Sequence, residues 1–314
     1  MRAIAIENFG GPEVMKLMDL PLPKPGAGEV LIQIKAAGVN PVDWKIRQGL
    51  LQGRLPHQFP IILGWDAAGT VVEVAAGIKG IKVGDEIIAY CRKEIIHDGA
   101  YAEFITLTPN HLAPRPKNLS WEEAAAIPLS ALTAYQSLFE NLQLKRNEVI
   151  LIHAGAGGVG GFAIQLAREA GAVIITTAST KHHDYVRSLG ASLPIDYKKE
   201  KFVDVILKKY PEGIDAVFDT IGEETQVESL RVLKPGGRLT SILALSDATQ
   251  KQSRCKIGYV FVRPESSHLR KITEMIEERK IKVQLAEVFP LEQAVKAHQM
   301  IETGHTQGKI ILRI

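Results

Sequence analysis

A glycine-rich segment near the middle of the chain has the spacing that binds phosphate groups. The aliphatic run Val149–Ile152 leads into residues 153–160, and an apolar helical pattern follows. Gly155, Gly157 and Gly160 fit the pattern Gly-x-Gly-x-x-Gly, in which the first glycine permits a tight turn, the second lets backbone approach a pyrophosphate and the third packs helix against strand. Because a strand precedes and a helix follows, with phosphate at the helix N-terminus, the segment predicts a dinucleotide site rather than a turn that binds nothing. The cofactor-binding residues predicted here are Gly155, Ala156, Gly157, Gly158 and Val159.

The end of the next predicted strand, Val173–Thr177, indicates which dinucleotide binds. Folds that bind NAD usually place an acid here to hold the ribose 2′-hydroxyl, and this chain has Ser179, Thr180 and Lys181 instead. Two hydroxyl donors and a cation suit a 2′-phosphate, so the sequence predicts NADPH as the cofactor. Alternatively, Ser179 or Thr180 caps the following helix while Lys181 is solvated, and capping is compatible with phosphate binding. His182 and His183 receive no role.

The elements around these residues change character along the chain. Up to about residue 120, short apolar runs separated by Gly and Pro predict strands and turns of a β-rich barrel. From about residue 121 to 262, helical patterns alternate with apolar runs at 149–152, 173–177, 214–218, 238–243 and 257–262, which predicts a parallel sheet covered by helices. The tail predicts helices at 267–279 and 291–301 and strands at 283–288 and 309–314. It is too short for a domain and is expected to rejoin the first segment.

Composition narrows the class of protein. The chain has 314 residues, enough for two domains, and 46% hydrophobic with 23% charged residues is typical of folded globular proteins. Its 38 basic and 35 acidic side chains are scattered, so no nucleic-acid partner is expected. Two cysteines suit a reducing compartment, and no apolar run has the ~18 residues of a membrane span. We therefore expect a cytoplasmic protein with a small-molecule substrate.

Ordered motifs along nearly the whole chain resemble the medium-chain dehydrogenase/reductase superfamily, in its zinc-free quinone oxidoreductase branch. The similarity is closest to enone and quinone reductases that carry Asn-Pro-x-Asp-x-Lys, present here at residues 40–45. The other matching motifs lie at residues 37–43, 63–69, 83–86, 99–103, 132–134, 154–160, 217–222, 233–237 and 302–310.

This resemblance implies an α/β protein with two domains. A GroES-like β-barrel catalytic domain would span residues 1–122 and 263–314, a Rossmann domain with a doubly wound parallel sheet would span 123–262, and the cofactor cleft would lie at their junction. Such proteins are commonly homodimers. Zinc-dependent relatives hold their metal where this chain has Asn40 and Trp65-Asp66, and their structural zinc lobe needs four cysteines, so no metal is expected.

Without zinc, another group must stabilise the negative charge that hydride transfer to a quinone or enone places on oxygen. Members with the Asn-Pro-x-Asp-x-Lys pattern are similar in placing Asn40, Asp43 and Lys45 beside nicotinamide and substrate, so these are the candidate catalytic residues. Alternatively, Asp43 and Lys45 form an exposed ion pair and Asn40 is a turn former. Many relatives have tyrosine where this chain has Trp44, which cannot donate a proton to an enolate; water or Tyr90 would then supply it, although packing is the commoner role of such a tyrosine.

Five further residues are expected at the cofactor. Thr133 resembles the family residue that contacts nicotinamide, although a helical threonine also bonds to its own backbone. Asp219 ends a parallel strand, where cofactors lie, and a helix cap is equally open. Gly222 would let backbone approach the adenosine ribose. Phe261 and Val262 resemble the segment whose backbone meets the carboxamide, and sheet core is their alternative.

Three classes of function follow from these residues. The favoured one is an NADPH-dependent reductase of quinones or α,β-unsaturated carbonyls that transfers hydride directly, without zinc. A catalytically weak NADPH-binding sensor or interaction protein is the alternative that Trp44 keeps open. A methyl-donor-dependent transferase, which also uses glycine turns, is disfavoured by the β-rich segment and by the other motifs. Cys91 is expected to be a small buried thiol rather than a nucleophile.

Overall fold

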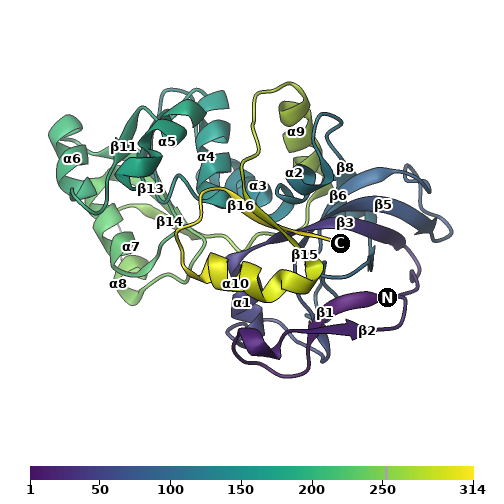
Figure 1. The fold of residues 1–314 in the computed structure, drawn as a ribbon. Coiled ribbons are helices and arrows are strands. Elements are labelled where there is room, and N and C mark those ends of the chain that lie inside the picture. Colours follow the sequence, from purple (N-terminus) through teal and green to yellow (C-terminus); the bar gives the residue numbers. More distant parts are fainter. Residues whose placement is uncertain (252–253) are drawn as a thin grey trace. The chain divides into compact units, whose positions relative to one another are not determined.

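The computed structural model describes residues 1–251 and 254–314. They form two compact units: unit 1 consists of residues 1–132 and 263–314, and unit 2 of residues 133–262. Both ends of the chain belong to unit 1 (Figure 1). The domain ranges expected from the sequence stay a prediction beside these units.

Unit 2 is built on a parallel sheet of six strands in the order β11-β10-β9-β12-β13-β14. The strands are β9 (Val149–Ile152), β10 (Val173–Thr177), β11 (Leu193–Ile195), β12 (Ile214–Asp219), β13 (Leu233–Ser241) and β14 (Lys256–Tyr259). From β9 the chain steps outward through β10 to β11 and then crosses to β12 on the other side of β9, which is the strand order of dinucleotide-binding sheets. The predicted doubly wound α/β fold is confirmed.

Helices cover both faces of this sheet, with α4 and α5 on one side and α7 and α8 on the other (Figure 1). The helices that belong wholly or partly to unit 2 are α3 (Pro128–Tyr135), the π-helix η3 (Gln136–Asn141), α4 (Gly158–Glu169), η4 (Thr180–His182), α5 (His183–Leu189), α6 (Phe202–Lys209), α7 (Glu223–Ser229), η5 (Leu230–Val232) and α8 (Asp247–Gln250).

The sheet's core explains why its strands read as apolar runs. Leu151, Ile175, Ile195, Val217 and Leu239, one from each of five strands, belong to one buried cluster. Strands covered on both faces need apolar side chains in both directions, unlike strands with one wet face. β11 has no counterpart among the predicted strands, because three residues with a proline at their centre give too weak a strand signal.

Unit 1 contains a three-stranded antiparallel sheet, β2-β1-β4, and a seven-stranded sheet, β15-β16-β3-β5-β6-β8, in which β7 also pairs with β3. Its strands are β1 (Arg2–Ile6), β2 (Lys16–Asp19), β3 (Val30–Val39), β4 (Ile61–Ile62), β5 (Asp66–Val74), β6 (Glu86–Tyr90), β7 (Phe104–Leu107), β8 (Leu112–Pro114), β15 (Leu285–Pro290) and β16 (Lys309–Arg313). Its other helices are η1 (Pro12–Val14), α1 (Pro41–Arg47), η2 (Pro109–His111), α2 (Trp121–Ala125), α9 (Ser266–Glu277), η6 (Leu291–Gln293) and α10 (Ala294–Glu302).

The C-terminal tail completes unit 1. β16 pairs antiparallel with β3, and β15 pairs parallel with β16, so the last strands extend a sheet begun by residues 30–39. α10 packs beside α1, as Figure 1 also shows. The expectation that the tail rejoins the first segment is confirmed. No helix within residues 1–251 and 254–314 is long and apolar enough to cross a bilayer.

Candidate active site

The glycine turn of unit 2 lies at the carboxyl end of the central strand. β9 ends at Ile152, Gly157 is the N-cap of α4, and the helix begins at Gly158. β12 pairs with β9 on the side where the strand order reverses, and ligands of such sheets bind at that point. Gly157, Gly158 and Val159 are half-buried, next to the buried Ala156, at a helix end whose first N–H groups lack partners within the helix. These residues fit the pyrophosphate of a dinucleotide.

The three motif glycines differ in what confines them. A Cβ at Gly155 would lie 2.1 Å from Thr176 Oγ1 on β10, and one at Gly160 would lie 2.3 Å from Ala154 O. Packing of turn, helix and strand therefore excludes side chains at both positions. A Cβ at Gly157 would meet only Ala154 O, at 3.3 Å. Gly157 is the least confined of the three, which is expected if the close neighbour there is a ligand.

An acid from another strand holds the end of β10. Asp196, which follows β11, accepts hydrogen bonds from Thr180 N at 3.0 Å and from Thr180 Oγ1. The Thr180 hydroxyl and the N–H of Lys198 lower the pKa of Asp196 to about 2. Ser179 is the N-cap of η4 but makes no side-chain capping bond, so the alternative in which its hydroxyl caps the helix is wrong. Asp196 holds this turn instead, through Thr180.

This arrangement leaves two candidate donors for a 2′-phosphate. The Thr180 hydroxyl hydrogen goes to Asp196, whereas Ser179 is half-buried and Lys181 is exposed. Asp196 is an acid that the sequence around residues 176–183 does not contain, and only the pairing of β10 with β11 brings it there. Its carboxylate already accepts Thr180 N–H and O–H and the N–H of Lys198, at 2.9 Å for the last.

Asp219 turns inward at the end of β12. Its Oδ1 accepts the N–H groups of Ile221 and Gly222, each at 3.0 Å, and its Oδ2 accepts from Ser241 Oγ at 2.6 Å and Gln226 Nε2 at 3.2 Å. The carboxyl group is fully buried and holds the loop before α7. Gly222 has φ 86°, a conformation that favours glycine, and is the N-cap of α7. Contact of either residue with a cofactor stays a prediction.

The remaining predicted cofactor residues also belong to unit 2. Thr133 on α3 is buried, and Phe261 and Val262 lie just beyond the end of β14 at Tyr259, half-buried and buried respectively. The predicted strand 257–262 thus ends earlier, which leaves the backbone of residues 261 and 262 outside β14. Their contacts with nicotinamide stay predictions.

His153, in the glycine segment, is a buried residue to which sequence reasoning gave no role. Its Nδ1 lies 3.1 Å from Thr177 Oγ1 and its Nε2 lies 2.9 Å from Ser229 Oγ. Thr177 Oγ1 also accepts the N–H of Ala154, and Ser229 donates to Thr225 O, so the imidazole fits as a neutral ring that carries its proton on Nε2. Burial lowers the pKa of His153 to about 4.

In unit 1, three strand ends meet around Asn40. β3 ends at Val39, and its antiparallel neighbours β16 and β5 begin there, so Lys309 and Asp66 flank Asn40. Gly38 faces Asp66 across the sheet, where a Cβ would lie 2.9 Å from Asp66 Cβ, so glycine is needed opposite this carboxylate. Asn40, Asp66 and Lys309 are all at least 95% buried.

These three side chains bond directly to one another. Asn40 Nδ2 donates to Asp66 Oδ2 at 2.8 Å, and Lys309 Nζ donates to Asn40 Oδ1 and, at 3.2 Å, to Asp66 Oδ2. Asp66 Oδ1 accepts the N–H of Leu129 at 2.6 Å. Burial raises the pKa of Asp66, and the Lys309 ammonium opposes that shift. Asn40 is thus no simple turn former, and sequence reasoning missed Lys309.

Asp43 heads a second buried chain of hydrogen bonds. Its Oδ2 accepts Asn40 N at 2.8 Å and Tyr101 OH at 2.9 Å. Tyr101 OH lies 3.2 Å from His298 Nε2, and Arg47 Nη1 lies 3.0 Å from His298 Nδ1. Burial raises the pKa of Asp43 to about 7 and lowers that of His298 to about 3. The alternative of an exposed Asp43–Lys45 pair is wrong, because Asp43 is 0% exposed and bonds elsewhere.

Lys45 lies on the same helix with a different environment. Its side chain is half-buried, its Nζ lies 5.6 Å from the centre of the Trp44 ring, and burial lowers its pKa. Among residues 1–251 and 254–314, no carboxylate forms an ion pair with it. Lys45 is therefore an ammonium donor that the protein has not already used. α1 itself is anchored through Arg47, which bonds to Glu302 Oε1 at 2.9 Å on α10.

Tyr90 and Cys91 lie next to this region. Tyr90 is fully buried and its ring packs edge-on against Trp65, 6.2 Å between centres. Burial raises the pKa values of Tyr90 and Cys91, which keeps the phenol and the thiol protonated. Cys91 is buried as expected, and the packing role of Tyr90 fits better than proton delivery.

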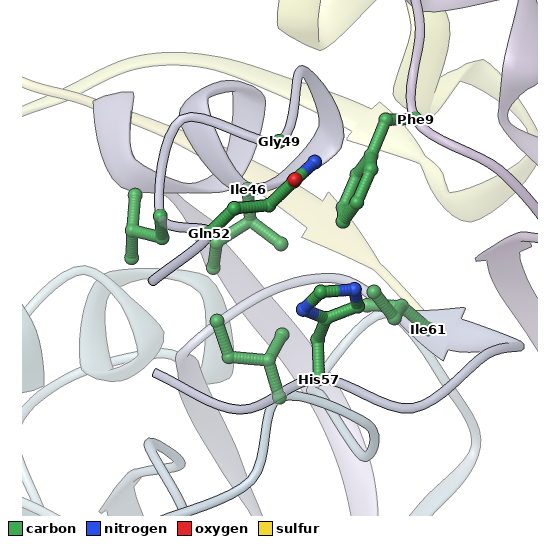
Figure 2. A pocket seen from close by; sticks show the side chains of 8 residues that line it. Phe9, Ile46, Gly49, Gln52, His57 and Ile61 are labelled. Atoms are coloured by element: carbon green, nitrogen blue, oxygen red, sulfur yellow. The ribbon is translucent and has the colours of Figure 1, made fainter. Parts of the chain in front are cut away.

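A hollow beside α1 is too small to be the substrate site. Its empty space measures about 180 Å³, and because part of that space is open solvent, the enclosed volume falls still further below the ~300–1,000 Å³ of usual ligand pockets. Figure 2 shows the rings of Phe9 and His57 flanking it, edge to face at 4.9 Å between centres, with Ile46 beside them. Its lining is mainly apolar, with Gln52 and His57 as the polar side chains, so we assign it no chemistry.

The donor set at Asn40 does not fit a zinc ion. In the part of the chain that the structure describes, no three side chains among His, Cys, Asp and Glu are grouped to hold a metal. Of the three positions that resemble zinc ligands, Trp65 offers no ligand atom, and Asn40 and Asp66 already bond to the Lys309 ammonium. A second cation beside that buried ammonium would be repelled.

Comparison with known proteins places these features in a family. Residues 26–117 match the model described as "Alcohol dehydrogenase GroES-like domain", and residues 189–312 match "Zinc-binding dehydrogenase". The chain is 34% identical to an NADPH-dependent alkenal/one oxidoreductase of Arabidopsis thaliana, over 99% of this chain and 79% of that one. The Coxiella burnetii quinone oxidoreductase superposes with a TM-score of 0.90 at 33% identity, covering 100% and 99% of the two chains. The Escherichia coli quinone oxidoreductase complexed with NADPH gives 0.90 at 30% identity and covers 100% of both.

Fold and similarity together define an oxidoreductase with a GroES-like part and a six-stranded Rossmann-type sheet. The chain belongs to the medium-chain dehydrogenase/reductase superfamily, in the branch of quinone and alkenal/one oxidoreductases. The predicted family and fold class are confirmed.

Proposed function

We propose that this protein is an NADPH-dependent reductase of quinones or α,β-unsaturated carbonyls that works by direct hydride transfer and without zinc. The observation that carries the proposal is the glycine turn between β9 and α4, at the point where the strand order reverses, followed by Ser179 and Lys181 at the end of β10. A bound NADPH would supply the hydride.

Gly155 to Val159 would hold the pyrophosphate, and Ser179 with Lys181 the 2′-phosphate. Asp196 is an anion tied to this turn, and it accepts hydrogen bonds from Thr180 and Lys198. A carboxylate occupied in this way is less able to take the ribose hydroxyl that an NAD site needs. The proposed preference for NADPH therefore rests on two features: Ser179 and Lys181 are available as donors, and the carboxylate of Asp196 already accepts hydrogen bonds from the protein.

In unit 1, Asn40 and Lys45 supply hydrogen-bond donors for an oxygen that gains negative charge. A partly buried ammonium is weakly hydrated and interacts more strongly with such an oxygen than an exposed one would. Asp43 takes a positioning role in this proposal, because its carboxylate holds the N-terminus of α1 and the Tyr101 hydroxyl. Thr133, Asp219, Gly222, Phe261 and Val262 stay proposed cofactor contacts.

The test is NADPH consumption by the purified protein with a panel of quinones, alkenals and cyclic enones, combined with titration of NADPH and NADH by fluorescence. We expect turnover with at least one class and tighter binding of NADPH. Equal affinity for the two cofactors at physiological salt would refute the cofactor assignment. Tight NADPH binding without turnover would favour the sensor alternative, for which Trp44 beside Lys45 is the sequence departure.

We also propose a cytoplasmic homodimer, as the family resemblance and the two buried free cysteines suggest. Light scattering of the purified chain and fractionation of the source cells test these two points separately from activity.

A further inference from the structure

The side-chain amide of Asn40 has an orientation that its neighbours determine. Lys309 Nζ lies at Asn40 Oδ1, and Asp66 Oδ2 lies 2.8 Å from Asn40 Nδ2. An ammonium only donates hydrogen bonds and a carboxylate only accepts them. The reversed amide would place its oxygen against the carboxylate and its NH₂ group against the ammonium, and both contacts would be repulsive.

The two neighbours are themselves held in place. Lys309 Nζ also donates to Val39 O at 3.2 Å, and Asp66 Oδ1 accepts Leu129 N at 2.6 Å. All of these groups are buried, so water cannot readily substitute for any of them. The amide is therefore locked from both sides.

This lock leaves one group of Asn40 available. Its Nδ2 carries two hydrogens, Asp66 takes one, and no other residue of the described chain accepts the second. Its Oδ1 is occupied by the ammonium, which also withdraws electron density from the amide and makes the remaining N–H a stronger donor.

We infer that Lys309 and Asp66 are positioning residues that make Asn40 present an N–H donor, never an oxygen, to the substrate. The site would thus select substrates with an acceptor oxygen that becomes negative on reduction, such as a quinone or enone carbonyl, over alcohols that must donate a hydrogen. The inference rests on the proposed function and adds to it which atom meets the oxygen and what holds that atom.

A double-mutant cycle tests whether Lys309 acts through Asn40. Lys309→Met should lower kcat with the best quinone or enone by about tenfold while NADPH affinity stays the same. Lys309→Arg, which keeps a cation at this position, should retain part of the kcat that Lys309→Met loses. In an Asn40→Ala background, Lys309→Met should cause no further loss, because the amide it orients is gone. Losses that multiply in the double variant would overturn the inference.

Two controls separate positioning from folding. Lys309→Met leaves the buried carboxylate of Asp66 without its cation, which can destabilise the fold. The double variant Lys309→Met/Asp66→Asn removes both charges and should show the same fall in kcat. Arg313→Met removes another β16 cation that pairs with a carboxylate, Glu122 at 2.8 Å, but does not touch Asn40, and it should keep the original kcat. A full rate in the charge-neutral variant would contradict the inference.

The amide can also be observed directly by ¹⁵N NMR. The Asn40 side-chain signal, identified by its loss in Asn40→Ala, should be protected from exchange and should move when Lys309→Met is introduced. An unmoved signal would overturn the orientation. If the unmodified protein turns over no substrate of the panel, both the proposed function and this inference fail. If it turns over substrate normally but the effects of Lys309→Met and Asn40→Ala are independent, only this inference fails.

Discussion

Replacing Gly160 by alanine is the sharpest way to test the packing of the glycine turn. The added Cβ would lie 2.3 Å from Ala154 O and 2.8 Å from Gly155 Cα, both backbone atoms that cannot rotate away. Overpacking of this kind costs about 1–3 kcal/mol, and the better helix propensity of alanine returns roughly 1 kcal/mol. Because both contacts are shorter than 3.0 Å and involve backbone, the cost lies in the upper part of that range, at about 2–3 kcal/mol. We therefore expect a net loss of about 1–2 kcal/mol in the free energy of unfolding, with weaker NADPH binding because α4 must shift.

Gly157→Ala is the matched comparison on the same turn. Gly157 has φ −76° and ψ 173°, which alanine adopts freely, and its Cβ would meet only Ala154 O at 3.3 Å. The entropy that alanine removes from the unfolded chain, ~0.4–1 kcal/mol, offsets its poorer N-capping. Stability should change by less than about 1 kcal/mol. A pyrophosphate held by these amides would lose one or two hydrogen bonds, which weakens NADPH binding by ~10–100-fold.

Urea denaturation gives the stability of both variants, and fluorescence titration gives their NADPH affinity. The two variants should differ in the property they lose: Gly160→Ala should lower the free energy of unfolding, whereas Gly157→Ala should mainly lower NADPH affinity. If Gly157→Ala bound NADPH as tightly as the unmodified chain, the turn would not be the pyrophosphate site. If Gly160→Ala were as stable as the unmodified chain, the packing account of this glycine would be wrong.

Three further substitutions address single groups. Lys45→Met should lower kcat/KM by ~10²-fold with NADPH affinity nearly unchanged, and steady-state kinetics that show an unaltered rate would end its role. Lys181→Ala should weaken NADPH binding by ~10-fold and leave NADH binding as it was, and parallel titrations that show equal losses would contradict a 2′-phosphate contact. The pKa of His153 is lowered to about 4, below its usual value of 6.5, so the unfolded chain binds the extra proton first. Stability from this group is complete above pH 6.5 and is lost towards pH 4, by up to ~1.4 kcal/mol per pH unit. His153→Gln should flatten that part of the urea-derived stability profile, and an identical pH dependence would show that His153 does not titrate as described.

Much of the fold was predictable because its signals are local. The apolar runs at 149–152 and 173–177 form β9 and β10 with the predicted bounds, because strands of a buried parallel sheet consist of nearly uninterrupted apolar residues. β11 was not predictable, because its three residues gain strand geometry only from pairing with β10. The alternative of a hydroxyl cap by Ser179 is wrong for a related reason, because Asp196 from the neighbouring loop accepts the N–H and the hydroxyl hydrogen of Thr180.

At the candidate site too, the sequence identified the residues, but their contacts depend on the tertiary structure. Asn40, Asp43 and Lys45 stand in one short motif, and the resemblance of that motif to the family pattern identified them as candidates. Their environments were not, because the partners of Asn40 and Asp43 lie 26, 58 and 269 residues away at Asp66, Tyr101 and Lys309. Burial then gave the motif residues different properties: Asp43 is enclosed and bonded, while Lys45 has no ion-pair partner among the residues that the structure describes.

The sequence by itself determined the alternation of strands and helices, the glycine spacing of the turn, and the residue types available for chemistry. Those properties follow from backbone geometry and side-chain pattern over a few residues. Only the tertiary structure decided which charges meet in the interior, which amide hydrogen is left over and which acid faces the second strand. These depend on strand pairing between distant segments and on the loss of water around buried groups, and neither is written in local sequence.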